Sequence, residues 1–359
     1  MAEVRVENLT KRFDNVVAVR DLSLTVHDGE FVVFLGPSGC GKTTTLRCIA
    51  GLEVPDGGEI RIGSDTVTKL PPAMRDIAFV FQQYALYPHL TVFDNLAFPL
   101  RATRTPKDVI ARRVQEVARI LHIEHLLDRR PGKISGGEMQ RVAIGRAMVR
   151  QPKVFLMDEP LTNLDAKLRM EMRAELKRLQ ADQRATTVYV THDQVEAMSM
   201  GDRVAVINEG RLLQYGTPTE VYDHPRDMFV AGFIGSPAMN MIPCRAEDNR
   251  ILLSGAMAIS LSNSPSSFRD LPRDIDLVLG ARPEDVALST EPAAEFLEGE
   301  VYVVEPLGSE NIVDIRLAGH ILKARTPPTF LVRAGQPIYL RVDLERAHVF
   351  DPCTQEALF

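Results

Sequence analysis

The chain has 359 residues, a formal net charge of −6 and an ordinary globular composition, with 45% hydrophobic and 25% charged residues. At roughly 100–200 residues per domain, this length predicts two or three domains, and the acidic balance argues against a general nucleic-acid binder, which needs a basic face. No basic segment followed by an apolar run opens the sequence, and aliphatic stretches such as residues 31–35 fall far short of the roughly 20 residues that span a bilayer. We therefore expect no secretory signal and only a peripheral membrane role.

Strands and a first helix are expected at the start of the chain. Alternating and continuous β-branched residues predict strands in the first forty residues, and a glycine-rich segment with a helix ending near Gly51 follows. From Thr91 to Arg150 the periodicity becomes helical. One buried helix face recurs at steps of three and four residues: Ile110, Val114, Val117 and Leu121.

Strand signals return in the second half of the chain. They lie in residues 153–160, KVFLMDEP, and 186–193, TTVYVTHD, and a helix from Leu164 to Gln183 is expected between them. This strand, helix, strand order favours a parallel sheet with right-handed crossovers. Glycine and proline interrupt the pattern at Phe233 to Pro243, and beyond it apolar and polar residues alternate, which predicts a separate, mostly antiparallel β domain.

The segment GPSGCGKT, residues 36–43, matches the phosphate-binding pattern G-x-x-x-x-G-K-[ST]. Its glycines allow backbone N–H groups to turn toward phosphate oxygens, and the helix that follows directs its positive end at them. Lys42 is expected to contact the β- and γ-phosphates and Thr43 to ligate Mg²⁺. A glycine-rich turn that binds nothing is the alternative. The predicted nucleotide-binding residues here are Gly36, Pro37, Ser38, Gly39, Cys40, Gly41, Lys42, Thr43 and Thr44.

Two acids, Asp158 and Glu159, follow the apolar run of the segment VFLMDE. Ligands of open α/β sheets bind at the carboxyl ends of the strands. Asp158 is therefore expected to hold Mg²⁺, and Glu159 to polarise the water that attacks a phosphate. The two acids could instead only cap the next helix. Together with Lys42, they predict hydrolysis of ATP or GTP.

The segment ISGGEMQRVAIGRA, residues 134–147, resembles the signature motif of ATP-binding cassette (ABC) ATPases. Three further segments resemble other motifs of this family: VFQQYALYPHLTV the glutamine loop, with Gln82; PLTNLDA the D-loop, with Asp165; and VTHD the switch-histidine segment, with His192. Phe13 stands where the family places an aromatic ring against adenine. The resemblance implies an α/β P-loop fold and a head-to-tail homodimer with two ATP molecules at its interface, each site completed by the partner's signature residues.

The resemblance also assigns roles to the matching residues. The catalytic residues it implies are Glu159, His192, Lys42 and Gln82. The Mg²⁺ ligands are Thr43, Gln82 and Asp158. The residues that bind ATP outside the phosphate loop are Phe13, Ser135, Gly136, Gly137, Glu138 and Asp165.

Segments along the whole chain, among them FVAGFIGSPAMN and GARPEDV, look like ATPase subunits of bacterial carbohydrate importers of the maltose, trehalose and glycerol-3-phosphate type. This resemblance implies an ABC nucleotide-binding domain at residues 1–235, with a helical subdomain at about 88–150, and a C-terminal all-β, oligonucleotide-binding-like regulatory domain at 236–359. It implies a peripheral position at the cytoplasmic face of the plasma membrane and no binding of nucleic acid. The implied partners are two membrane-spanning permeases, which contact the surface around Gln82 to His89, and an extracytoplasmic solute-binding protein.

Two residues depart from the family pattern. Thr162 replaces the serine usual in the D-loop and keeps a hydroxyl, whereas Glu138 replaces the signature glutamine and adds a negative charge. Ser135 and Glu138 have the S-x-x-E spacing of a capping box, worth about 1 kcal/mol, but two unit charges about 6 Å apart repel by roughly 3 kcal/mol at an effective dielectric constant of about 20. Glu138 is therefore expected to turn toward the backbone N–H of Ser135, or to pair with a cation such as Arg141 or Lys133.

Other readings remain open at this stage. The chain could serve an importer of another solute, such as an inorganic anion, iron or a polyamine. It could be a soluble ABC ATPase that acts on DNA or ribosomes, although neither a coiled-coil insert nor a second cassette is visible. The C-terminal β domain could also be the functional centre, binding a small anion or a regulatory protein.

Overall fold

The computed structural model describes residues 2–150, 152–162, 164–247, 250–253, 258–261, 268, 271, 275–293 and 295–359. The chain divides by its internal contacts into an N-terminal unit, Met1–Pro218, and a C-terminal unit, Thr219–Phe359. This division falls before the domain boundary that the sequence predicts between residues 235 and 236. The short helices α7 (Pro218–Asp223) and α8 (Met228–Phe233) lie in the segment between the two positions. Among the described residues, no helix combines the length and apolar character needed to cross a membrane.

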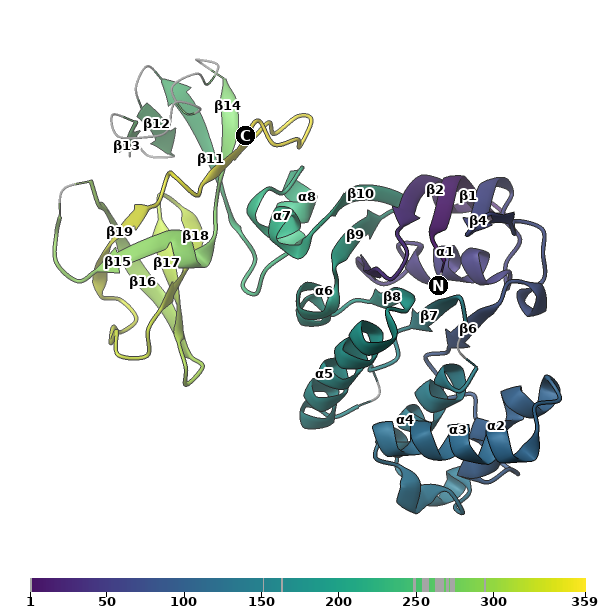
Figure 1. Ribbon diagram of the computed structural model, residues 1–359. Helices are drawn as coiled ribbons and strands as arrows, with labels where there is room; N and C mark the ends of the chain where they lie inside the picture. The colour runs from purple at the N-terminus through teal and green to yellow at the C-terminus, as the bar shows by residue number, and fades with distance from the viewer. Residues whose placement is uncertain are drawn as a thin grey trace. The chain divides into compact units, whose positions relative to one another are not determined.

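A six-stranded sheet with the order β10-β9-β3-β8-β7-β6 forms the centre of the N-terminal unit (Figure 1). Its strands are β3 (Phe31–Leu35), β6 (Ile77–Val80), β7 (Val154–Asp158), β8 (Thr186–Thr191), β9 (Arg203–Asn208) and β10 (Arg211–Gly216). The five strands from β9 to β6 are parallel, and β10 is antiparallel to β9. Helix α5 connects the neighbouring strands β7 and β8, so the prediction of a parallel sheet with helical crossovers is confirmed. Helix α5 begins at Ala166 rather than Leu164, because the Asp165 side chain caps it.

A second, antiparallel sheet and helix α1 (Lys42–Ala50) share a hydrophobic core with the parallel sheet. The second sheet has the order β2-β1-β4-β5. Its strands are β1 (Val4–Phe13), β2 (Val16–Val26), β4 (Gly57–Ile62) and β5 (Asp65–Thr66). Strand β3 is buried along its whole length, as its continuous apolar sequence predicts for a central parallel strand. The P-loop sequence therefore starts from a rigid, fully packed strand.

Three helices, α2 (Val92–Ala102), α3 (Lys107–Ile120) and α4 (Gly136–Met148), pack against one another within the N-terminal unit (Figure 1). The predicted apolar face of α3 and the residue after it, Ile110, Val114, Val117 and Leu121, is buried as expected. A side chain at Gly145 of α4 would lie only 2.8 Å from Leu96 of α2, so glycine permits this close packing. The remaining helices of this unit are η1 (Pro72–Met74), η2 (Glu124–Leu126), η3 (Pro131–Lys133), α5 (Ala166–Gln183) and α6 (Gln194–Met200).

The described residues of the C-terminal unit form two antiparallel sheets of five strands each, which confirms the predicted β domain. The first has the order β13-β12-β11-β14-β20, with strands β11 (Asn240–Glu247), β12 (Arg250–Leu253), β13 (Ala258–Ser260), β14 (Asp276–Ala281) and β20 (His348–Phe350). The second has the order β15-β19-β16-β17-β18, with strands β15 (Val286–Ser289), β16 (Leu297–Pro306), β17 (Asn311–Leu317), β18 (His320–Thr326) and β19 (Pro337–Val342). A 3-10 helix, η5 (Pro283–Asp285), precedes β15. Ile338, Leu340 and Val342 alternate into the core, as the period of two predicts.

The end of helix α1 is held by one buried cation, Arg75, which is 3% exposed. Its guanidinium group donates hydrogen bonds of 2.7–3.1 Å to the carbonyl oxygens of Cys48, Ile49, Thr68 and Leu70. Burial lowers the pKa of this group, since the surrounding protein solvates its charge less well than water does. Carbonyls at the end of a helix have no partner within the helix, and Arg75 satisfies two of them.

We predict that Arg75→Met destabilises the N-terminal unit by about 2–4 kcal/mol, because four carbonyl oxygens lose a charged donor within the protein. The measurement is the free energy of unfolding in urea, followed by circular dichroism. Arg61→Met is the matched control, since the exposed Arg61 side chain bonds to Glu59 within its own strand, and it should leave the unfolding midpoint unchanged. Equal effects of the two substitutions would contradict the role assigned to Arg75.

Candidate functional site

The P-loop runs from the end of β3 to the start of α1, and close contacts leave no room for a side chain at two of its glycines. A Cβ atom at Gly36 would lie 2.1 Å from the carbonyl oxygen of Ile207, and one at Gly41 would lie 2.4 Å from that of Ala18. Gly41 also has a φ of 105°, a conformation that L-residues with side chains rarely adopt. Pro37, Ser38, Gly39, Cys40 and Thr44 complete the loop and the first turn of the helix. The loop thus has the backbone geometry that the phosphate-binding pattern predicts.

Lys42 closes the loop on itself. Its ammonium group donates hydrogen bonds of 2.8 Å to the carbonyl oxygens of Gly36 and Pro37, and the residue is 4% exposed. The sulfur of Cys40 lies 3.7 Å from the same nitrogen. Burial raises the pKa of this thiol and outweighs the nearby Lys42 charge, which lowers it. The amine is therefore already directed across the space that the loop encloses.

Asp158 and Thr43 meet where β7 and α1 approach each other. The Thr43 hydroxyl donates a 2.8 Å hydrogen bond to Oδ1 of Asp158, a residue that is 5% exposed. Burial raises the pKa of the Asp158 carboxyl, while the bond from Thr43 opposes this shift. A hydroxyl and a carboxylate oxygen at this spacing suit a small hard cation such as Mg²⁺. The donor set therefore fits the metal site that the sequence predicts.

Three side chains converge on the carboxylate of Glu159. Gln82 Nε2 and the Thr162 hydroxyl lie 3.1 and 3.2 Å from Oε2, and His192 Nδ1 lies 3.3 Å from Oε1. Glu159 has a φ of 43°, which is uncommon for a residue with a side chain, and its N–H donates to Val190 O at 3.0 Å. Non-glycine residues held in this region occur at functional sites more often than elsewhere. The hydroxyl that Thr162 keeps in place of the usual serine contributes directly to this cluster.

The strand order explains why these residues meet. Gln82 follows β6, Glu159 follows β7, His192 follows β8 and the P-loop follows β3, and these four strands are parallel neighbours. Their carboxyl ends therefore lie along one edge of the sheet. The expectation that the His192 strand neighbours the paired-acid strand is confirmed by the pairing of Asp158 with Val190.

The segment KISGGEMQR forms the start of α4, with Ser135 as N-cap and a complete capping box. Oε2 of Glu138 accepts hydrogen bonds from the Ser135 N–H at 2.7 Å and from the Ser135 hydroxyl at 2.8 Å. These bonds are the main reason that the pKa of Glu138 is lowered. The expected turn of Glu138 toward its own N-cap is confirmed, and the Nε2 atom of the His125 ring lies 3.9 Å from Oε1.

The glycines of this segment contact two other predicted motifs. A Cβ atom at Gly137 would lie 2.0 Å from Leu168, in the first turn of the helix that Asp165 caps by accepting a 3.0 Å bond from the Leu168 N–H. A Cβ atom at Gly136 would lie 2.9 Å from the hydroxyl of Tyr84 in the glutamine loop. Asn163, in the predicted D-loop, lies outside the described residues.

The predicted residues of the P-loop and those around Asp158 and Glu159 thus form one connected cluster. The signature segment and Phe13 are two further elements. In the described part of the chain, no hydrogen bond or ion pair joins Ser135 or Glu138 to the P-loop. Phe13 lies at the end of β1, where it is 42% exposed and has the Lys11 ammonium group 5.1 Å from its ring centroid. An exposed ring and an exposed helix start are both available to a ligand or to a second chain.

Sequence reasoning missed Glu196, which lies beneath the His192 segment. This carboxylate is 3% exposed and accepts hydrogen bonds from the hydroxyls of Tyr189 and Thr191 at 2.8 and 2.7 Å. Burial raises the pKa of the Glu196 carboxyl and outweighs the two hydrogen bonds, which lower it. Its only sequence signal is an acidic residue in a predicted first helical turn, which is also the ordinary pattern of a surface helix. Glu196 therefore supports the end of β8 without facing the P-loop cluster in any contact described here.

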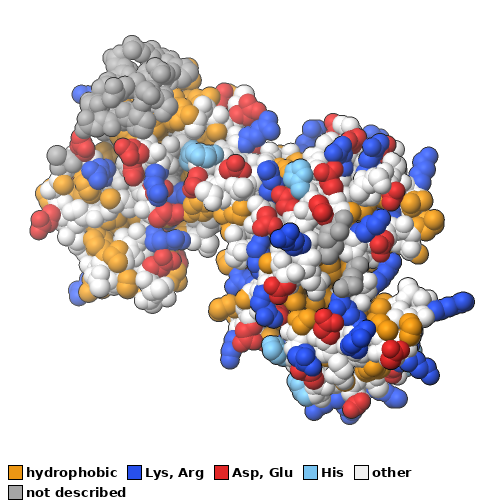
Figure 2. All heavy atoms as spheres, viewed as in Figure 1, with side chains coloured by type: hydrophobic (Ala, Val, Ile, Leu, Met, Phe, Trp, Pro, Cys, Tyr) orange, Lys and Arg blue, Asp and Glu red, His pale blue; other side chains and the backbone are white. Residues whose placement is uncertain are grey.

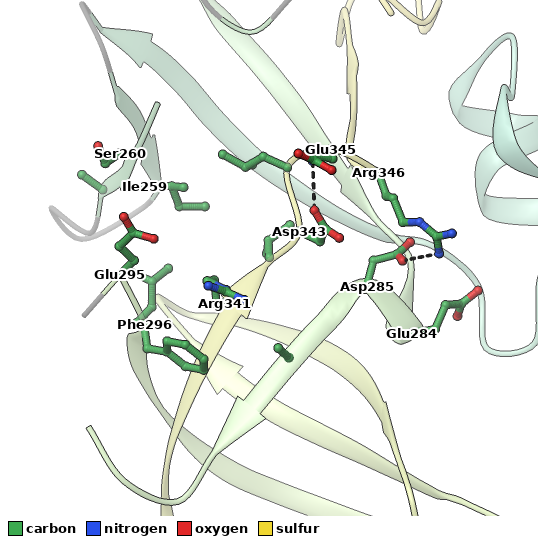
Figure 3. A pocket seen from close by; sticks show the side chains of 15 residues that line it. Ile259, Ser260, Glu284, Asp285, Glu295, Phe296, Arg341, Asp343, Glu345 and Arg346 are labelled. Atoms are coloured by element: carbon green, nitrogen blue, oxygen red, sulfur yellow. Dashed lines mark hydrogen bonds and ion pairs between the residues drawn. The ribbon is translucent and has the colours of Figure 1, made fainter. Parts of the chain in front are cut away.

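A cavity of about 770 Å³ lies in the C-terminal unit, and none of its lining residues is a predicted site residue (Figure 3). Its charged lining residues are Glu284, Asp285, Glu295, Arg341, Asp343, Glu345 and Arg346. Figure 3 shows the Arg346 guanidinium group beside Asp285, at 3.2 Å, and Arg341 above the Phe296 ring, at 5.4 Å from its centroid. Five carboxylates against two guanidinium groups make this lining acidic.

Comparisons with known proteins match these observations. The profile of the ABC transporter family matches residues 19–162, that of the MalK OB fold domain residues 235–286, and that of the TOBE domain residues 279–350. The trehalose/maltose import ATP-binding protein MalK of Thermococcus litoralis is 50% identical, and the alignment covers 100% of both chains. The sulfoquinovosyl glycerol transport ATP-binding protein SmoE of Agrobacterium fabrum is 46% identical over 100% of both chains.

Solved structures resemble the N-terminal part of the chain. The dimeric structure of a post-hydrolysis state of the ATP-binding cassette MJ0796, bound to ADP and phosphate, is 32% identical with a TM-score of 0.55. The match covers 60% of this chain and 98% of that one. The structure of cbiO1 from Clostridium perfringens, part of an ABC transporter complex, is 29% identical with a TM-score of 0.57, and covers 61% of this chain and 89% of that one.

We predict that Glu138→Gln leaves the fold intact and increases ATP-dependent dimerisation or turnover. The glutamine amide still accepts from Ser135, but it removes a charge that would repel a γ-phosphate about 6 Å away by roughly 3 kcal/mol. Dimerisation is measured by size-exclusion chromatography across ATP concentrations, and turnover as phosphate release. Glu116→Gln is the control, because Glu116 is an exposed carboxylate on α3 that pairs with Arg113. Unchanged ATPase activity in the assembled transporter at every ATP concentration would count against repulsion.

Proposed function

We propose that this chain, which belongs to the ABC transporter family, is an ATP-hydrolysing subunit and energises import of a carbohydrate or related solute. The observation that carries the ATPase assignment is the convergence of Gln82, Thr162 and His192 on Glu159, beside the P-loop. The import assignment is supported by relatives that are named as import or transport ATP-binding proteins and align along the full chain.

The phosphate site requires little rearrangement to accept ATP. The carbonyl oxygens of Gly36 and Pro37 hold the Lys42 amine within the loop, and this amine can exchange them for the β- and γ-phosphate oxygens. The start of α1 directs its N–H groups and positive dipole toward the same phosphates. Phe13 is positioned on an exposed strand end to stack against the adenine ring.

Mg²⁺ would be held by Thr43 and Asp158, with Gln82 as a further ligand, and would neutralise charge on the phosphates. Each of these side chains presents an oxygen atom, and Thr43 and Asp158 already meet at 2.8 Å. The metal site therefore needs the Thr43 hydroxyl to turn its proton away from Asp158.

Hydrolysis is assigned to Glu159. Its carboxylate accepts the proton of the attacking water while the new oxygen–phosphorus bond forms, and the bond between the β–γ bridging oxygen and the γ-phosphorus breaks. Gln82 and His192, both in contact with this carboxylate, orient it and the water. A positioned general base contributes roughly 10²–10⁴ in rate.

The signature segment is proposed to act on the ATP of a second subunit. Its helix start carries Gly136 and Gly137, has no hydrogen bond to its own P-loop in the described residues, and so has donors for a phosphate brought by a partner. A dimeric ABC cassette with ADP and phosphate has been solved among the structural relatives. Head-to-tail closure around two ATP molecules therefore accounts for the separation of these motifs within one chain.

The partners follow from import. A subunit without a spanning helix among its described residues must act on permeases in the membrane, and the surface around Gln82 to His89 is the proposed contact. We place the subunit at the cytoplasmic face, where ATP is available, with a separate extracytoplasmic protein delivering the solute. ATP binding and permease movement would then bias each other, because coupling between two sites is reciprocal.

The alternatives have less support. The visible face of the N-terminal unit carries acidic and basic side chains interspersed, rather than one basic surface (Figure 2), which gives no support to a DNA-directed ATPase. The acidic cavity of the C-terminal unit disfavours a small anion as its ligand. An importer of another solute remains the second candidate, and uptake of labelled sugars, glycerol 3-phosphate, polyamines and oxyanions by a deletion strain distinguishes these classes.

We predict that Glu159→Gln lowers ATP turnover by about 10²-fold or more and still permits ATP binding and a closed dimer, because the amide cannot accept the proton. The measurements are steady-state phosphate release and ATP-dependent dimerisation of the same protein. Glu171→Gln, on α5 and away from the P-loop cluster, serves as the control and should hydrolyse ATP normally. Near-normal hydrolysis by Glu159→Gln would remove Glu159 as the base.

A further inference from the structure

The loop of residues 83–91 connects Gln82, at the hydrolysis cluster, with helix α2. One side chain from α2 holds its middle. Asn95 is fully buried, accepts a 2.8 Å bond from the Tyr87 N–H and donates a 3.1 Å bond to the Tyr87 carbonyl oxygen. The middle of the loop is therefore fixed to α2 by two hydrogen bonds between the Asn95 side chain and the Tyr87 backbone.

A second side chain, Arg146, reaches the loop from α4. Its Nη1 donates a 2.7 Å hydrogen bond to the carbonyl oxygen of Ala85, and its guanidinium carbon lies 5.5 Å from the centroid of the Tyr87 ring. Ala85 has a φ of 48°, so the carbonyl that Arg146 binds belongs to a residue in a sparsely populated conformation.

Arg146 is an unusual cation in this part of the fold. Burial lowers the pKa of its guanidinium group, and within the described ranges no carboxylate forms an ion pair with it. The charge is partly buried, and the Ala85 carbonyl oxygen and the Tyr87 ring contribute to its stabilisation.

The same loop touches both ends of α4. The Tyr84 hydroxyl lies against Gly136 in the first turn, whereas Arg146, which binds the next residue of the loop, stands in the last turn. Eleven residues separate Ser135 from Arg146, about three helical turns and roughly 16 Å, which places them on nearly the same side of the helix. Helix α4 is buried along much of its length, and its backbone joins the two ends that the loop contacts.

The opposite side of the loop is accessible to a partner. The Tyr87 ring, under Arg146, also contacts Phe98, with centroids 4.5 Å apart, and Phe98 is 43% exposed. A continuous series of contacts thus leads from an exposed aromatic ring through Tyr87 and Arg146 into the signature helix.

We propose that Arg146 is a positioning residue that couples the loop 83–91 to the signature end of α4. This inference rests on the proposed function, in which Ser135 completes the ATP site of a second subunit. When ATP draws the start of α4 into a dimer, Arg146 and Tyr84 carry the loop with it. Displacement of the loop by a permease moves α4 through the same contacts.

The test uses the full-length chain with Glu159→Gln, so that ATP is bound but not consumed, and follows hydrogen exchange of peptides covering residues 83–91. In this parent, ATP with Mg²⁺ is expected to produce a dimer and to slow exchange in the loop by about tenfold. Adding Arg146→Met should leave the ATP dependence of dimerisation within about twofold while the exchange of the loop no longer responds to ATP. A purely structural contribution would raise exchange equally with and without ATP, so the difference between the two states is the readout.

Arg150→Met is the matched control, because Arg150 lies two residues beyond α4 and contacts Asp76 and Ile77 rather than the loop. It should retain the full response. If Arg146→Met lowers the thermal midpoint, Arg146→Gln carries the same test, since its side chain stays polar but is shorter than the arginine that bonds to Ala85 and lies over the Tyr87 ring. A full exchange response in Arg146→Met, or in Arg146→Gln, contradicts the proposal. A parent that binds ATP without forming a dimer contradicts the proposed function instead.

Discussion

The parallel pairing of β6, β7, β8 and β3 is the constraint on which the rest of the N-terminal unit depends. Parallel neighbours bring their carboxyl ends to the same edge, so four segments far apart in the sequence deliver Gln82, Glu159, His192 and the P-loop to one place. The buried strands also fix the backbone that leaves them. Glu159 can hold a left-handed φ because its N–H is bonded to Val190 in the adjacent strand.

Local sequence was sufficient to predict the parts of the site that are formed by local structure. The P-loop, the buried face of α3 and the capping box of Ser135 and Glu138 each lie within one short segment, so spacing alone specifies their geometry. The neighbouring positions of β7 and β8 also followed, because a short helical crossover between parallel strands usually joins neighbours. The resemblance to ABC ATPases added roles that spacing could not give, such as those of Gln82 and His192.

Contacts between distant segments could not be predicted in the same way. The side chain near Glu138 is His125 rather than Arg141 or Lys133, because η2 brings it there and no local spacing predicts that packing. Arg146 carries only the signal of a basic residue in the last turn of a helix, which usually indicates a favourable interaction with the helix dipole. Its bond to Ala85 depends on how the loop 83–91 packs between α2 and α4. The same holds for Arg75, whose four acceptors come from two segments.

The capping box has a consequence for how long two subunits stay together. While a subunit is alone, Glu138 satisfies both the N–H and the hydroxyl of Ser135. A phosphate that binds the serine hydroxyl must therefore replace an existing bond, so the net free energy of closing the dimer is smaller than the number of new contacts suggests. Once phosphate departs, the carboxylate can reclaim both donors at once. In the proposed dimer, Glu138 would thus weaken association and also shorten the lifetime of the spent dimer, which would favour release of products and the start of another cycle.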